Sequence, residues 1–451
     1  MKPTVAIRCL YFRIIYTVIV IEVTPLERYE KMLAAAETAV SNHEYRRAND
    51  DLAHLLALLD EHPQDTLAYR QLLTDVLVRY GEICAVLGEI NEGMALLQRA
   101  KETAVTQKQF HRIASTIGNV SIRLGNTEVA LAHHQEALRI AELEANKAWI
   151  AIAASNISSS YKHNGDTDNA IIFAETAVSL YEQLGDVDGQ VNALIRVGLI
   201  YEFLGQFDKD ISALRKAEQL AREHHIPQNL AVVLNNLGEG YRHLYAVDDA
   251  FVCHEEGLAI ARSLYTHETE IDLHRNLGVD LIMMGNADDG VTHLWYALLR
   301  SRKLGMVDTM QQALFSLALA ELNADDQEMA RQHIAELTRL ADQSDRLTYR
   351  ADALYALGLY HQKMSDFKRA HKLLKRVCAL TYKTGRSERL WQAHAALARL
   401  VVDGGRTAVH NRIAAKIIHQ IADPIEDERL QQLFLNAEPI RAVLDAIPPA
   451  K

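Results

Sequence analysis

The sequence predicts an all-α fold, a solenoid of antiparallel helix pairs, from three observations. Proline is absent between Pro63 and Pro227 and between Pro227 and Pro424, which favours helices because proline inside a helix costs about 3 kcal/mol. A small residue returns every forty residues, each time after an aliphatic one: Gly118, Ser158, Gly198, Gly238, Gly278, Ala318 and Gly358. A turn position follows seven residues later, with Tyr245 as the exception in type: Gly125, Gly165, Gly205, Tyr245, Gly285, Asp325 and Ser365. A fixed period of this length is typical of stacked repeats, which bury together the apolar face that one pair exposes.

The composition favours a soluble, cytoplasmic protein without a cofactor or a metal. The chain has 451 residues and a formal net charge of −11, which argues against nonspecific binding to nucleic acid or to an anionic membrane surface. Its four cysteines form no CxxC pair, so we expect reduced thiols rather than disulfides or a zinc site: Cys9, Cys84, Cys253 and Cys378.

Three segments are predicted along the chain: an extension over 1–23, the solenoid over 24–400, and capping helices over 401–451. The extension is rich in β-branched and aromatic residues, and Arg13 interrupts its apolar run. We expect a disordered or loosely docked tail, or a misassigned start, rather than a signal peptide or a membrane anchor.

The first helices precede the regular period. Thr24, Pro25 and Glu27 have the order of a capping box, with Thr24 as N-cap. The periodicity of apolar residues predicts helices over 26–40, 45–59, 66–87 and 91–105.

Each forty-residue unit is expected to contain two helices, as over 190–204 and 209–222. Gly205 ends the first helix in a left-handed conformation, and Phe207 and Asp208 form the turn. The small ladder residues let the two backbones approach, since a larger side chain would overpack the contact. After the ladder, a loop over 401–405 leads to helices over 407–421, 426–435 and 438–446.

The pattern resembles the tetratricopeptide repeat over roughly residues 26–400. Gly198, Tyr201, Gly205, Leu214 and Ala217 match five of the six consensus positions, and Asp210 departs from the sixth. The units near Ala318 and Gly358 are more degenerate, with Glu321 and His361 in place of the aromatic residue. The period of forty exceeds the usual 34 and resembles Rap-type quorum-sensing receptors and kinesin light chains. The resemblance implies a right-handed superhelix of about nine to ten helix pairs.

No motif of a known catalytic or phosphate-binding site occurs, so we expect a protein that is not an enzyme. His134 and His254 occupy inward positions of their helices, where a satisfied core imidazole is expected rather than a metal ligand. The acidic pairs in the turns, such as Asp288 and Asp289, are expected to cap helix N-termini.

The resemblance implies a partner on the concave face, lined by the first helix of each pair. Its rows lie six, three and two residues before the ladder position and one after it, and they contain many Asn and Arg side chains, as well as Asp352 and Tyr355. Asparagine both donates and accepts hydrogen bonds, which suits a peptide backbone, although it equally suits bonds between neighbouring repeats. The candidate partner-binding residues are Arg112, Asn119, Asn156, Asn192, Arg196, Asn235, Asn236, Arg275 and Asn276.

One subset resembles the carboxylate clamp of chaperone-binding members of the family. Asn119, Asn156 and Arg196 fall on three of its five positions, but Ser115 and Asn192 stand where the family has lysines. The loss of two charges weakens a carboxylate grip, so the clamp is kept as an alternative.

The sequence therefore predicts a non-catalytic scaffold or adaptor that holds a protein or peptide segment in a concave groove. The alternative is a peptide- or ligand-responsive sensor module of a bacterial signalling or transcription-control system. The partner, the pathway and the oligomeric state are left open by the sequence.

Overall fold

A computed structural model describes residues 24–41, 44–343, 346–400 and 404–447. Within these ranges the regular elements are helices α2 to α23, without a strand, which confirms the all-α prediction. The predicted extension over 1–23 lies outside the described residues. The chain divides into two compact units, 1–120 and 121–451, which are called unit 1 and unit 2 and are described separately.

Unit 1 is a set of helices around its own core, and the unit boundary falls within α6. Tyr69, Leu77 and Leu97 belong to this core, together with Ile113 and Ile117 at the start of the ladder. Its helices are α2 (Pro25–Ser41), α3 (Tyr45–Glu61), α4 (Leu67–Leu87), α5 (Ile90–Thr103) and α6 (Gln107–Arg123).

The first helix begins at the predicted capping box. The Glu27 backbone N–H donates to Thr24 Oγ1 at 3.3 Å, and the Thr24 N–H donates to Glu27 Oε2 at 3.1 Å. These reciprocal bonds satisfy two backbone donors that have no partner within the helix.

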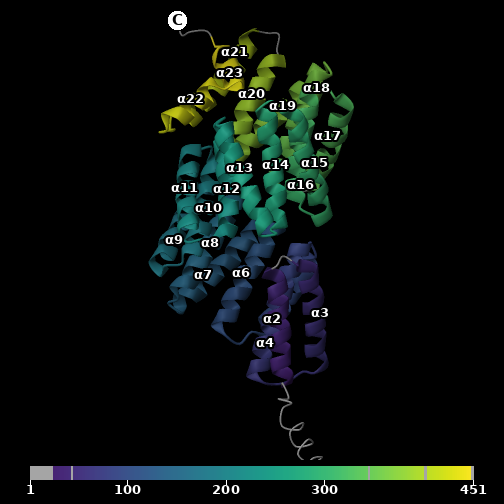
Figure 1. Cartoon of the computed structure of the whole chain (residues 1–451), viewed down its shortest axis with the longest axis vertical. Coiled ribbons are helices and arrows are strands. Elements are labelled where there is room, and N and C mark those ends of the chain that lie inside the picture. The colour runs from purple at the N-terminus through teal and green to yellow at the C-terminus, as the bar shows by residue number, and fades with distance from the viewer. Residues whose placement is uncertain (1–23, 42–43, 344–345, 401–403, 448–451) are drawn as a thin grey trace, which may run out of the picture. The chain divides into compact units, whose positions relative to one another are not determined.

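Unit 2 contains two layers of helices that alternate along the chain (Figure 1). The inner layer consists of α8 (Lys147–Asn164), α10 (Val187–Leu204), α12 (Pro227–His243), α14 (His267–Met283), α16 (Val307–Asn323), α18 (Leu347–Lys363) and α20 (Ser387–Leu400). The outer layer consists of α7 (Thr127–Leu143), α9 (Thr167–Leu184), α11 (Phe207–Glu223), α13 (Val247–Ser263), α15 (Ala287–Leu304), α17 (Gln327–Asp342) and α19 (Phe367–Thr384). Each inner helix contacts the next inner helix, so unit 2 is a solenoid.

The turn between the helices of a pair adopts the left-handed conformation at every ladder repeat. Gly205 has φ +72°, as predicted, and glycine adopts this conformation without strain. Tyr245, the exception by residue type, takes the same conformation at φ +58°. The turn geometry is therefore kept even where a bulky residue pays for it in strain.

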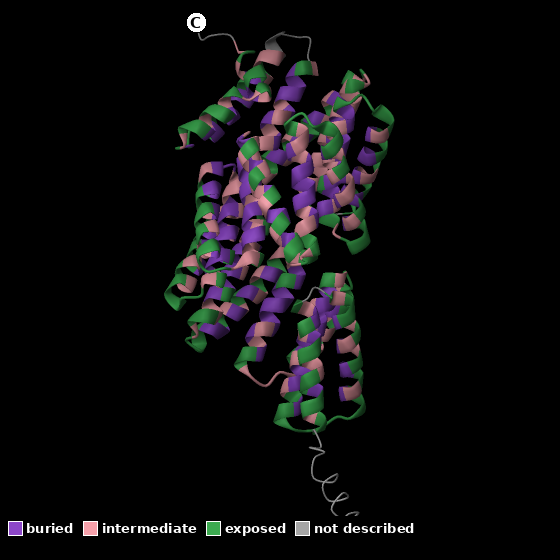
Figure 2. Cartoon of the chain, in the orientation of Figure 1, coloured by how far each residue is buried: buried purple, intermediate pink, exposed green. Residues whose placement is uncertain are grey.

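The ladder residues lie where two helices touch. A Cβ atom added to Gly278 would lie 2.8 Å from the Gly290 carbonyl oxygen, and one added to Gly238 would lie 2.3 Å from His254 Nε2. Such distances confirm that a small residue is needed at these contacts. Buried stripes accordingly follow the facing sides of the helices (Figure 2).

The last helices pack onto the middle of unit 2. They are α21 (Gly404–Ala422), α22 (Glu428–Asn436) and α23 (Glu438–Leu444). Phe434 and Ile440 lie in one hydrophobic cluster with Leu237 and Leu244 of the α12 region and with Trp391 of α20. The rim of this contact carries an ion pair between Arg429 and Asp249, 2.8 Å long. The chain therefore folds back on itself, over nearly two hundred positions in sequence.

Some predicted boundaries are wrong by a few residues. The sequence predicts a loop at Gly404 and Gly405, but both are helical, and α11 begins at Phe207, where a turn is predicted. Helix α10 begins three residues early, because Asp186 caps it by accepting from the Gly189 N–H at 2.9 Å. Among the described residues, no helix is long and apolar enough to cross a membrane.

Candidate functional site

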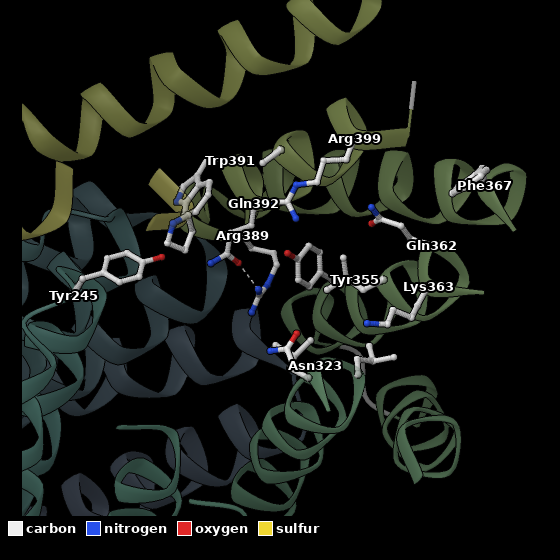
Figure 3. Close-up of a pocket in the computed structure, with 15 residues that line it drawn as sticks. Tyr245, Asn323, Tyr355, Gln362, Lys363, Phe367, Arg389, Trp391, Gln392 and Arg399 are labelled. Carbon is white, nitrogen blue, oxygen red and sulfur yellow. Dashed lines mark hydrogen bonds between the residues drawn. The ribbon is translucent and has the colours of Figure 1, made fainter. Parts of the chain in front are cut away.

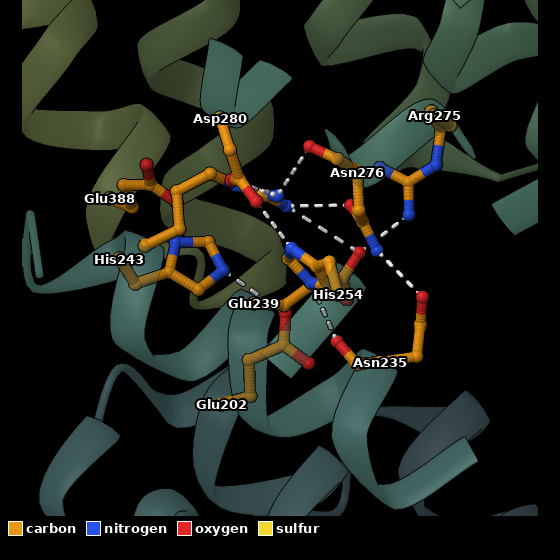
Figure 4. A network of polar contacts seen from close by, with 10 residues as sticks. Glu202, Asn235, Glu239, His243, His254, Arg275, Asn276, Asp280 and Glu388 are labelled. Atoms are coloured by element: carbon orange, nitrogen blue, oxygen red, sulfur yellow. Dashed lines mark hydrogen bonds and ion pairs between the residues drawn. The ribbon is translucent and has the colours of Figure 1, made fainter. Parts of the chain in front are cut away.

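The inner face of α12 and α14 holds a buried network of charged and amide side chains (Figure 4). Asp280 is fully buried and accepts from Arg242 Nη1 at 3.1 Å. Its other oxygen contacts His254 Nδ1, while His254 Nε2 donates to the Asn235 carbonyl at 3.0 Å. Both ring nitrogens of His254 therefore have an oxygen partner within the protein. The prediction of a satisfied core histidine is confirmed at this position.

Two predicted partner-binding asparagines bond to each other within this network. Asn276 Nδ2 donates to Asn235 Oδ1 at 2.9 Å, and Asn276 Oδ1 accepts from Arg242 Nη2 at 2.9 Å. Asn276 is fully buried and Asn235 is half-buried. A buried amide with its donors and acceptors satisfied holds neighbouring helices together, and in this conformation it offers a partner little.

Arg275 is also buried and donates to Glu239. Burial by itself would raise the pKa of Glu239, but the Arg275 and Arg242 guanidinium groups outweigh it and lower that pKa to about 2. The Arg275 Nε atom has no hydrogen-bond partner among the described residues. Asn236, on the neighbouring turn of α12, is half-buried.

A second charged cluster joins α10, α12 and α20. His243 Nε2 lies 3.3 Å from Glu202, and His243 Nδ1 lies 3.0 Å from Glu388. Burial would lower the pKa of His243, but Glu388 and Glu202 together raise it to about 10. The imidazolium therefore bridges an early and a late helix of unit 2.

Asp210 is the residue at which its repeat departs from the consensus, and its surroundings show how a carboxyl group fits there. It is buried between two glycines, and a Cβ atom on Gly198 or Gly240 would lie 2.9 Å or 2.8 Å from its carboxylate oxygens. Burial, and then the nearby Glu202, raise the pKa of Asp210 well above its usual value. A repeat that carries a carboxyl group here thus requires glycine on both neighbouring helices.

The remaining candidates in unit 2 lie on α8 and α10. Asn192 is exposed, and its Nδ2 donates to the Asp188 carbonyl at 3.0 Å. Arg196 is half-buried and donates to the Ser159 hydroxyl, and Asn156 is half-buried. In unit 1, Arg112 forms an ion pair with Glu82 at 3.4 Å, and Asn119 is exposed.

A pocket of unit 2 lies further along the inner layer, against α16, α18 and α20 (Figure 3). Its volume is about 720 Å³, and its walls combine aromatic, aliphatic, amide and cationic side chains. Its lining residues are Tyr245, Leu319, Leu322, Asn323, Tyr355, Leu359, Gln362, Lys363, Phe367, Arg389, Trp391, Gln392, Ala395, Arg399 and Pro439. The left-handed turn at Tyr245 and the start of α23 at Pro439 both contribute to it, so the folded-back helices complete its wall.

Among the cationic side chains of the pocket, Arg389 is held by both aromatic rings and an ion pair. Its guanidinium lies between two rings, 4.6 Å from the centre of Phe315 and 4.7 Å from that of Tyr355. Its Nε donates to Asp352 at 2.8 Å, and Asp352 also accepts from Arg386 at 3.0 Å. Stacking and ion pairing together hold the side chain in one position.

Part of this pocket follows from the concave rows that the sequence predicts. Tyr355 and Asp352 already belong to the predicted concave rows, and Leu359 follows a ladder residue. One further step of forty from Gly358 reaches Ala398, which places Gln392 and Arg399 in the same rows. Trp391, Tyr245 and Pro439 carry no such signal, because only the fold-back brings them together.

A separate group in unit 1 has the side chains of a metal site. The ligand atoms of Cys84, Glu89 and Glu92 lie within 4.8 Å of one another. Burial, followed by the two carboxylates, raises the pKa of the Cys84 thiol to about 12. A thiol so strongly protonated is a poor ligand until a cation displaces its proton.

The repeats, the two layers and the small ladder residues define a repeat protein of the α-solenoid class. Tetratricopeptide-repeat family models match residues 109–183, 191–224 and 230–266. The chain is a tetratricopeptide repeat protein, similar to Rap-type arrays, as the sequence pattern predicted. No curated protein matches its sequence.

Solved structures share the fold at low sequence identity. The crystal structure of a Rap protein complexed with Competence and Sporulation Factor has a TM-score of 0.57 and 14% identity, covering 80% of this chain and 99% of that one. The crystal structure of aspartyl phosphate phosphatase F from Bacillus subtilis has a TM-score of 0.52 and 15% identity, covering 79% of this chain and 94% of that one. These similarities concern the fold alone.

Proposed function

We propose that this protein is a non-catalytic scaffold that binds a short peptide segment on the inner face of unit 2. The observation that carries the proposal is the pocket of about 720 Å³ against α16, α18 and α20. Its size and its mixture of aromatic walls with a few amides and cations are typical of sites for small ligands and peptides. Gln362 and Asn323 supply donors and acceptors of the kind that a peptide backbone pairs with, whereas the Gln392 amide already bonds to Arg389 and Glu388.

A protein of the same fold supports this proposal. The Rap protein whose fold is similar was crystallised with Competence and Sporulation Factor, so this architecture accommodates a bound factor. We place the ligand of the present chain by its own pocket, because the sequence identity is only 14%.

Binding rather than catalysis also suits the thiols. Burial raises the pKa of Cys253 to about 12 and that of Cys378 to about 11, so both are protonated and weak nucleophiles at neutral pH. Free thiols and a net charge of −11 fit a cytoplasmic protein that does not bind nucleic acid nonspecifically.

The second candidate function is a sensor that responds to its ligand. Three parts of unit 2 line the pocket: the turn at Tyr245, the helices α16, α18, α19 and α20, and α23 at Pro439. A ligand that contacts all three stabilises the folded-back arrangement relative to a more open one, provided that its affinity for the two differs. A change in the small-angle scattering profile on peptide addition would favour the sensor over the passive scaffold.

A binding screen with a pocket-filling variant tests the proposal. A displayed library of random octapeptides is selected on the full chain, and the affinities of recovered peptides are measured by fluorescence anisotropy. Asn323→Trp places a large side chain in the pocket from an exposed position and should lower the affinity at least tenfold. Lys303→Trp adds the same indole at an exposed position of α15 and should leave the affinity unchanged. Equal affinities of the two variants would place the peptide elsewhere.

The predicted Asn and Arg rows remain a second proposed location. The triple substitution Asn156→Ala, Arg196→Ala and Asn236→Ala removes polar groups of α8, α10 and α12 while the pocket stays intact. If this variant loses the peptide and Asn323→Trp retains it, the rows rather than the pocket hold the partner. Peptides with free and amidated C-termini then decide whether the carboxylate-clamp alternative applies, because a clamp requires the free end.

A further inference from the structure

A stripe of three residues on α20 gives the pocket a direction. Trp391, Ala395 and Arg399 are spaced four residues apart, so they lie along one face of the helix, and all three line the pocket. The small Ala395 leaves room between the indole at one end and the guanidinium at the other. Eight residues of helix rise about 12 Å, which an extended chain of about four residues spans.

The two ends of the stripe differ in charge and in exposure. Arg399 is exposed and reaches from α20 toward Tyr355 (Figure 3), and it has no ion-pair partner within the described part of the chain. The other two cations of the pocket are already neutralised, Lys363 by Asp325 at 2.6 Å and Arg389 by Asp352. None of the described residues that line the pocket carries a carboxylate, so Arg399 is left to attract a negative group.

The buried end of the stripe carries a hydrogen-bond donor without an acceptor. Trp391 is only 3% exposed, and its indole Nε1 has no hydrogen-bond partner among the described residues. A buried donor without an acceptor is destabilising, so a ligand that supplies a carbonyl oxygen gains the hydrogen bond. Because the nitrogen is shielded from water, a contact with a peptide carbonyl requires the ring to turn toward the cavity.

We propose that the pocket selects a short acidic peptide that lies extended along the Trp391–Ala395–Arg399 stripe. An Asp or Glu side chain of the peptide pairs with Arg399. About four residues away, a peptide carbonyl accepts from Trp391 Nε1. An apolar side chain between them packs on Leu322 and Leu359. This inference rests on the proposed function, because it names the class of peptide for the same pocket.

The test uses pools of hexapeptides with blocked ends that differ at one fixed position. The fixed residue is Glu, Gln or Lys, and the other positions are mixtures of Leu, Ile, Phe, Tyr, Ser and Gly. Retention on the full chain is measured by affinity selection and mass spectrometry. An exposed ion pair contributes about 0.2–1 kcal/mol, so the Glu pool should be retained up to about fivefold better than the Gln pool, with the Lys pool last.

Substitutions at the two ends sharpen the test. Arg399→Glu should reverse the preference to the Lys pool, whereas Lys372→Glu, at an exposed position of α19 outside the pocket, should leave it unchanged. Trp391→Phe keeps an aromatic ring without the N–H and should lower retention of the Glu and Gln pools alike, by about fivefold. Arg399 is exposed, so its variant tests the charge even where Trp391→Phe disturbs folding.

The outcomes separate this inference from the proposed function. Equal retention of the Glu and Gln pools, both lost in Asn323→Trp, overturns the acidic peptide and leaves peptide binding intact. A Gln pool with a free C-terminus that outbinds the blocked Glu pool overturns the side-chain assignment, because the chain end then supplies the carboxylate. No retention of any pool, together with a failed octapeptide screen, overturns both proposals.

Discussion

Two regions of the inner layer of unit 2 use polar residues in opposite ways. On α12 and α14, the half-buried Arg242 donates to the fully buried Asn276 and Asp280. On α16, α18 and α20, the polar side chains surround an open pocket together with aromatic rings. The first region belongs to repeats that follow the consensus closely, and the second begins where the repeats become degenerate. The packing of α12 and α14 satisfies most of their buried polar groups, whereas the packing around α16, α18 and α20 leaves space that a ligand can fill.

The largest expected effect comes from breaking the buried network. Asp280→Ala removes the carboxylate that contacts both the half-buried Arg242 and the fully buried His254, and the loss of one member of a buried charge cluster costs about 3–5 kcal/mol. Circular dichroism during urea unfolding measures the loss. Asp423→Ala, whose side chain is 77% exposed, serves as the control and should change little. A similar stability for both variants would mean that the network contributes nothing to folding.

An intermediate effect is expected at the bridge between α12 and α20. The pKa of His243 is raised from 6.5 to about 10, so its contribution to stability is complete below pH 6.5 and disappears as the pH rises through 10. The difference in melting temperature between the wild type and His243→Gln should therefore shrink from pH 6.5 to pH 10. A difference that grows or stays constant over this range would contradict the charged bridge.

The smallest effect on stability is expected in the predicted polar rows. Asn192 is exposed and, among the described residues, its side chain bonds to Asp188 of its own helix alone, so Asn192→Ala should change the free energy of unfolding by less than about 0.5 kcal/mol. Its effect on peptide affinity sharpens the comparison between the regions. Unchanged affinity agrees with a ligand in the pocket, whereas a tenfold loss moves the ligand to α8 and α10.

Much of the fold could be predicted from local patterns. The capping box at Thr24, the left-handed turn at Gly205 and the close contact at Gly278 each follow from residue type and spacing. Helix ends were less accurate, as at Gly404, because packing extends a helix beyond what propensity favours. The predicted concave rows contained Tyr355 of the candidate site. They did not reveal which of their side chains line a pocket, because that depends on how closely neighbouring repeats pack.

The sequence by itself determined the repeat architecture. Small residues and turn residues recur every forty positions, and such a period indicates stacked helix pairs. The tertiary structure decided which polar side chains bond to each other and which line the pocket. It also decided that Tyr245, Trp391 and Pro439 share one pocket. The physical reason is that the last helices pack their apolar faces onto α12, as Phe434 and Ile440 do, and no local pattern specifies a contact over such a separation in sequence.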